Sequence, residues 1–203
     1  SGAQATLDTS VRRTPPLAYK VLVDARDVLD LANPHQLQTW VHLLLAHDAM
    51  LRAGDATGAR VRAGDVTFVH GWAFVKLRKR KHNRRGEPES VPLTPLPRAH
   101  RHFSAVAMLR KYLRRTGLEE HPDAPIFPVL DRRGRVKLPA RPRWATYDAW
   151  YRTFTATLTA AGHPGVTPQA GRAGGFTDAV AGGMEPVSAA KVGGWSPYGA
   201  WPR

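Results

Sequence analysis

Apolar residues recur every three or four positions in one long stretch near the start of the chain. Between residues 33 and 51 this spacing is followed by Leu37, Trp40, Val41, Leu44 and Leu45. Periodicity of this kind, opened by an Asn-Pro pair, predicts a buried helix over 34–51.

The same spacing returns in two later segments. It predicts an amphipathic helix from Pro97 to near Gly117 and a further helix from Trp144 to Ala161. Shorter apolar runs predict short helices over 21–31, 53–62, 174–181 and 186–192. The Pro- and Arg-rich segment 121–143 is longer than an ordinary connection, which is typical of functional or mobile loops.

Between these helices the pattern changes to short strands. Residues 66–69 and 72–77 flank a His70-Gly71 turn and predict a β-hairpin, and residues 90–93 predict a third strand. The fold class is therefore mainly α with a small antiparallel β-sheet (α+β). We expect residues 1–33 to form a linker or N-terminal arm and residues 34–203 to form one domain.

Charge narrows the choice of partner. The chain has 30 Lys and Arg against 16 Asp and Glu, a formal net charge of +14, which favours a polyanion such as nucleic acid. It has no cysteine, so a disulfide framework and a thiolate metal site are excluded. No apolar run reaches the length of about 18 residues that a membrane span needs. These features predict an intracellular protein that does not enter a membrane.

The densest run of positive charge begins in the second strand of the predicted hairpin, and His82 is its only other ionisable side chain. A solvated hairpin and a phosphate-binding hairpin explain this run equally well. Its members, which we predict to contact DNA if the second explanation holds, are Lys76, Arg78, Lys79, Arg80, Lys81, Arg84 and Arg85.

Two further arginines stand in unusual surroundings. Arg52 follows a buried helix and has Asp55 three positions on, so a structural ion pair and an anion-binding role are both open. Arg172 lies in a segment rich in Gly and Ala, which we expect to be a loop where a phosphate can approach the backbone. Trp195 follows Gly193-Gly194 and is either an indole donor or a core residue.

Taken in order, these motifs resemble the catalytic domain of tyrosine recombinases, the phage-integrase family. The resemblance runs from about Pro34 to the end of the chain. Segment 51–55 is similar to the first-arginine motif with its acidic residue, although the spacing to the next segment is slightly longer than in the family. Segments 79–83 and 91–93 resemble the family's hairpin, with Lys81 at the catalytic lysine and Lys79 as the alternative.

The later motifs resemble the family with one departure. Segment 168–175 is similar to the box that normally contains His-x-x-Arg, but Gln169 stands at the histidine position before Arg172. Glutamine can donate a hydrogen bond to phosphate but cannot transfer a proton. Trp195 corresponds to the following His-or-Trp position. The nucleophilic tyrosine of the family is expected just past Arg203, and Tyr198 lies too close to Trp195 to replace it.

The resemblance implies a DNA strand transferase for recombination, integration or transposition. A tyrosine attacks a DNA phosphodiester and forms a 3′-phosphotyrosyl link, and the freed 5′-hydroxyl then attacks a partner strand. The implied catalytic residues are Arg52, Lys81, Gln169, Arg172 and Trp195, supported by Asp55, with no metal or other cofactor. The implied partners are double-stranded DNA and further copies of the chain, as a tetramer, in a bacterial cytoplasm or a eukaryotic nucleus.

Two alternatives remain open. A DNA-binding protein derived from such an enzyme but without activity would explain Gln169 and the absence of the tyrosine from these 203 residues. A basic nucleic-acid-binding module unrelated to recombination would require four motifs in the right order to have arisen by chance.

Overall fold

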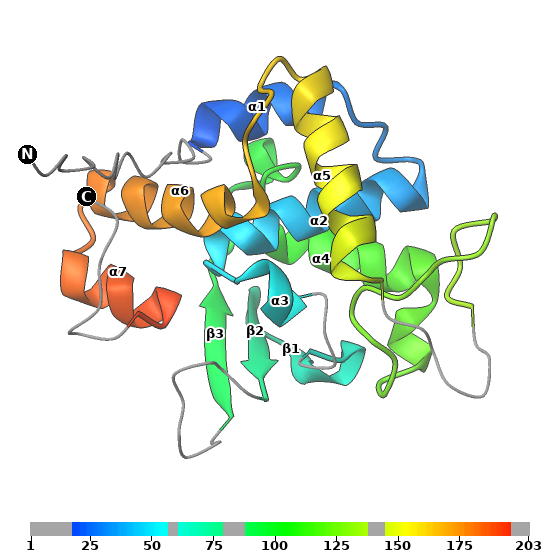
Figure 1. Ribbon diagram of the computed structural model, residues 1–203. Coiled ribbons are helices and arrows are strands. Elements are labelled where there is room, and N and C mark those ends of the chain that lie inside the picture. The colour runs from blue at the N-terminus through cyan, green and yellow to red at the C-terminus, as the bar shows by residue number, and fades with distance from the viewer. Residues whose placement is uncertain (1–17, 57–60, 79–87, 138–144, 196–203) are drawn as a thin grey trace, which may run out of the picture.

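The computed structural model describes residues 18–56, 61–78, 88–137 and 145–195, in which helices surround a small sheet (Figure 1). Seven α-helices lie in these ranges: α1 Tyr19–Asp27, α2 Pro34–Asp48, α3 Ala53–Ala56, α4 Ala105–Thr116, α5 Tyr147–Ala160, α6 Pro168–Ala181 and α7 Pro186–Gly193. The strands are β1 Val66–Val69, β2 Trp72–Leu77 and β3 Glu89–Leu93. The expected α+β class is confirmed.

Helix α2 is the central element of the core. Leu37, Trp40, Leu43, Leu44 and Leu45 are all buried, and α4, α5 and α6 each pack against α2. The buried Trp40 donates its indole N–H to the carbonyl of His102, 2.7 Å away. The amide of Gln38 donates to the hydroxyl of Tyr112 on α4, and this hydroxyl donates to the carbonyl of Ile126. Hydrogen bonds therefore orient the large polar side chains of an otherwise apolar core.

The three strands form an antiparallel sheet in the order β1-β2-β3. Val66 pairs with Val75 and Val69 pairs with Trp72 across the predicted hairpin, whose turn places His70 and Gly71 at positive φ. Ala73 pairs with Leu93 at one end of the second ladder, and Leu77 pairs with Glu89 at the other. The β1–β2 turn and the β2–β3 connection therefore lie at opposite ends of the sheet.

Several helix boundaries differ from the sequence expectation. The helix expected from Pro97 begins only at Ala105, because Ser104 caps it by accepting a hydrogen bond from the backbone N–H of Ala107. It ends as predicted at Gly117, which takes a left-handed φ of 78°. Within the expected N-terminal arm, α1 buries Val21, Leu22 and Ala25 in the core, so residues 18–33 pack with the domain.

The expected glycine-rich loop around Arg172 is wrong, because these residues lie inside helix α6. The glycines face α2 rather than solvent. A Cβ at Gly171 would lie 2.8 Å from the Cβ of Ala46, and a Cβ at Gly175 would overlap the carbonyl oxygen of His47. Gly171 and Gly175 lie one turn apart on the same face of α6, so this face can pack closely against α2 at both positions. Because these glycines have no side chain, α6 can approach α2 closely, although glycine lowers the helix propensity of α6.

None of the helices in the described ranges is both long enough and apolar enough to cross a membrane.

We predict that Gly175→Ala destabilises the fold by about 1–3 kcal/mol, because the added methyl group meets a backbone carbonyl that cannot move aside. Equilibrium urea unfolding measures this loss. Gly54→Ala is the matched control, because a Cβ at this helical position has no atom within 4 Å. The control should be neutral or slightly stabilising. Equal unfolding midpoints for Gly175→Ala and the unsubstituted protein would contradict the close packing of α6 on α2.

Candidate active site

Arg52 lies just beyond the end of α2, at the start of the α3 turn. Its backbone N–H donates to the carboxylate of Asp55 over 3.2 Å, and its carbonyl accepts the N–H of Asp55 over 2.8 Å. Asp55 is only 1% exposed. These reciprocal bonds fix the backbone on both sides of Arg52. The Nη1 atom of the guanidinium is buried and has no hydrogen-bond partner among the described residues, so it can donate to an anionic oxygen.

Arg172 is held on α6 by an aromatic contact. Its side chain is buried, with the residue 7% exposed, and its Cζ lies 3.8 Å from the centroid of a Trp195 ring. Trp195 in turn meets Phe176 edge to face at 5.4 Å. A Cβ at Gly193 would overlap the Trp195 ring, so glycine is required for the ring to lie there. The indole thus positions the guanidinium through a cation–π contact.

Gln169 lies in the first turn of α6, which begins at Pro168. The residue is exposed and stands three positions before Arg172, so the two side chains share one face of the helix. Its amide can donate to a ligand at the helix start, where the free backbone N–H groups also favour negative charge.

The predicted sites are brought together by the packing of α6 on α2. Gly171 contacts Ala46 near the end of α2, and Gly175 contacts His47. Met50, which follows α2 at a φ of 48°, joins Phe176 in a small apolar cluster with Ala189 and Ala190 of α7. The chain segments that carry Arg52, Arg172 and Trp195 therefore meet at one corner of the domain.

The hairpin residues are only partly described. Lys76 is exposed on β2. Arg78 donates its Nε–H to the buried carboxylate of Asp65, at 2.8 and 3.1 Å, a pairing that the sequence did not suggest. The predicted contacts of both residues with DNA stay predictions. The remaining predicted hairpin contacts lie outside the described residues: Lys79, Arg80, Lys81, Arg84 and Arg85. The position of the proposed catalytic lysine therefore stays a prediction.

No group of three or more His, Cys, Asp or Glu side chains in the described ranges is arranged to hold a metal ion.

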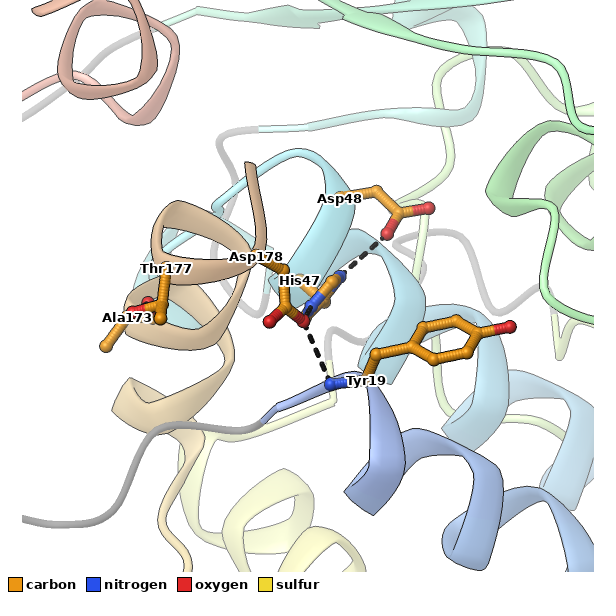
Figure 2. Close-up of polar contacts among 6 residues, drawn as sticks. All are labelled: Tyr19, His47, Asp48, Ala173, Thr177 and Asp178. Atoms are coloured by element: carbon orange, nitrogen blue, oxygen red, sulfur yellow. Dashed lines mark hydrogen bonds and ion pairs between the residues drawn. The ribbon is translucent and has the colours of Figure 1, made fainter. Parts of the chain in front are cut away.

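An ionic network behind the corner was not predicted (Figure 2). His47 is hydrogen-bonded on both ring nitrogens, Nδ1 to Asp48 and Nε2 to Asp178, each over 2.9 Å. The same Asp178 oxygen accepts the backbone N–H of Tyr19 at the start of α1. The network therefore joins α1, α2 and α6. The adjacent His47-Asp48 pair is visible in the sequence, but nothing in the sequence connects it to Asp178, 131 positions later.

The two carboxylates determine the charge of the ring. A carboxylate only accepts hydrogen bonds, so a ring bonded to one on each side carries both protons. Burial by itself favours the neutral ring, but the hydrogen bonds and charges of Asp48 and Asp178 outweigh it and raise the pKa of His47 above its ordinary value.

Solved structures of tyrosine recombinases have the same fold. XerA recombinase matches with a TM-score of 0.63 and 14% identity over 92% of this chain and 56% of that one. XerH site-specific recombinase, in a post-cleavage complex with its palindromic difH substrate, matches with a TM-score of 0.61 and 12% identity. This match covers 89% of this chain and 46% of that one. The integrase from mycobacterium phage Brujita matches with a TM-score of 0.58 and 16% identity, over 94% of this chain and 52% of that one. The expected likeness to the catalytic domain of tyrosine recombinases is confirmed at the level of fold.

The chain spans about half the length of these recombinases. Neither a family model nor a curated protein matches it by sequence.

We predict a pH-dependent contribution of His47 to stability. Because its pKa is raised in the folded protein, this contribution is complete below about pH 6.5, the pKa of an unperturbed histidine, and is lost as the pH rises through the higher folded value. Each unit of pKa difference corresponds to about 1.4 kcal/mol. Thermal unfolding between pH 6 and pH 9 measures the effect.

His47→Gln is the comparison variant, because it cannot titrate. The unsubstituted protein should lose more stability than this variant between pH 6 and pH 9, and Asp178→Asn should show an intermediate loss. If stability changed with pH in parallel for all three proteins, the His47 network would not be the cause of the pH dependence.

Proposed function

We propose that this chain is the phosphate-binding part of a tyrosine recombinase, which cleaves and rejoins DNA strands through a 3′-phosphotyrosyl intermediate. The observation that carries the proposal is the corner of α2 and α6. There Arg172, stacked on Trp195, and Arg52, with a buried Nη1 atom available to an acceptor, lie on packed segments of a recombinase-like fold.

The chemistry follows from the charge of the reacting phosphate. When a tyrosine oxygen bonds to phosphorus, negative charge gathers on the non-bridging oxygens before the bond to the 5′ oxygen breaks. Two guanidiniums, from Arg52 and Arg172, stabilise that charge by donating N–H groups in a fixed geometry. Lys81 donates the proton that the departing 5′ oxygen takes up. The bond to tyrosine conserves the energy of the phosphodiester for rejoining.

Gln169 and Trp195 complete the proposed phosphate site in different ways. Gln169, on the exposed face of α6, donates a hydrogen bond to a phosphate oxygen. Trp195 acts first as a positioning residue for Arg172, because their contact fixes the guanidinium. The tyrosine nucleophile is expected in the sequence just after Arg203. We propose double-stranded DNA as the substrate and a homo-tetramer as the working assembly.

We predict that Arg172→Ala lowers the rate of covalent adduct formation on a nicked suicide duplex by about 10²-fold or more, because one charged donor to the transition state is lost. The protein must carry the tyrosine expected after Arg203, and adducts are counted by denaturing gel. Arg132→Ala, which removes an exposed arginine from a loop, should react at the unsubstituted rate. Failure of the tyrosine-bearing protein to form any adduct would contradict the enzyme and favour a DNA-binding protein without activity.

We also predict that Gln169→His accelerates cleavage, by up to about 10²-fold, because an imidazole can transfer a proton where an amide cannot. Its rate should acquire a pH dependence between about pH 6 and 7 that the unsubstituted protein lacks. Gln169→Asn, which keeps the amide but shortens its reach, should be slower than both. A histidine variant no faster than the glutamine protein would assign residue 169 to phosphate binding alone.

A further inference from the structure

A second basic surface covers the outer face of α4. A groove of about 510 Å³ runs between α4, the β1–β2 turn at Gly71 and the segment after β3 at Pro95 and Leu96. Four cationic side chains line its α4 wall: Arg110, Lys111, Arg114 and Arg115. We call this surface the α4 groove. The proposed function uses none of these residues.

Three of the four cations are held in place by contacts that leave their charge intact. Arg110 places its guanidinium 4.5 Å above the ring of Phe68. Lys111 donates its ammonium to the carbonyl of Leu31, and Arg115 donates to the carbonyl of Ala32. Since the side chains are already ordered, a ligand does not have to pay the full entropy of fixing them.

The positive charge of the α4 groove is not neutralised within the described residues. No carboxylate there forms an ion pair with any of its four cations. Partial burial, and then repulsion from Arg115, Arg26 and Arg101, lowers the pKa of Lys111, against a weaker opposing effect of Asp30. Like charges one turn apart also destabilise a helix by a few tenths of a kcal/mol per pair. An anion in the groove would relieve this repulsion.

The α4 groove lies apart from the proposed active site. Gly71 and Pro95 mark the end of the sheet opposite the connection that carries Lys81. Helix α4 contacts α2 at Gln38, near the start of α2, whereas α6 contacts it at Ala46 and His47, near its end. In Figure 1, α5 and α6 lie in front of α2 and α4 lies behind it. A straight duplex held by Arg52 and Arg172 would therefore leave the groove free.

We propose that the α4 groove binds the sugar-phosphate backbone of a second DNA duplex, so that one chain can hold two duplexes at once. Arg110 and Arg114 are separated by one helical turn, about 6 Å along the axis. This separation is comparable to that of neighbouring phosphates on one strand, which rise by about 3.4 Å along the duplex axis and are also rotated about it, so both arginines can meet phosphates of the same strand. The inference depends on the proposed function only for the choice of DNA as partner.

Native mass spectrometry of the 203-residue chain with short duplexes at low salt tests the proposal. We expect a complex of one chain with two duplexes. Arg110→Gln with Arg114→Gln should lower its abundance at least about tenfold and keep the one-duplex complex, and the salt slope of second-duplex binding should fall by about two. Arg114→Glu alone should also weaken the second binding step, and it leaves the contact of Arg110 with Phe68 in place.

Arg132→Gln with Arg133→Gln is the matched control, because it removes the same charge from exposed loop positions outside the groove. It should retain the two-duplex complex. A chain that binds only one duplex, or groove variants that bind two as well as the control does, would overturn the α4 groove proposal alone. Persistence of two-duplex binding together with cleavage that does not need Arg172 would instead overturn the proposed function.

Discussion

The close approach of α6 to α2 is the constraint on which the candidate site depends. A helix with side chains at positions 171 and 175 would be held away from Ala46 and His47, and Arg172 would move outward with it. The glycines lower the intrinsic stability of α6, by roughly 1 kcal/mol each relative to alanine. Packing against α2 offsets this cost. The small residues that suggested a phosphate-binding loop therefore position Arg172 by allowing α6 to pack closely on α2.

Once the helices are in contact, polar groups determine how the corner is held. Asp178 connects α6 to His47 on α2 and to the first N–H of α1, so its single carboxylate ties three helices behind the site. Between one and two turns earlier on α6, Arg172 lies against Trp195, whose ring also contacts Phe176. The guanidinium of Arg172 is therefore positioned by contacts within the protein, as the proposed stabilisation of a transition state requires.

The sequence predicted those features that depend on local pattern. The hairpin at 66–77, the buried helix beginning at Pro34 and the end of α4 at Gly117 follow from alternation, helical spacing and a glycine stop. It predicted a helix only from residue 174 and did not predict that Gly171 lies inside it, because glycine content favours a loop unless the partner surface is known. It also missed the pairing of Arg78 with Asp65 and of His47 with Asp178, because neither depends on a local pattern.

The positions of the cations distinguish two proposed roles, chemistry and duplex binding, which the net charge alone does not distinguish. A net charge of +14 is consistent with one DNA-binding face, but two groups of cations stand apart in the structure: Arg52 and Arg172 on the segments that meet at the corner of α2 and α6, and the four cations of the α4 groove. Arg172 is buried against an aromatic ring, whereas Arg114 is exposed among the like charges that line the α4 groove. Chemistry requires a few cations in fixed positions, and duplex binding requires several that match a repeating phosphate spacing. On the two proposals made above, the α4 groove serves duplex binding and the corner of α2 and α6 serves the chemistry.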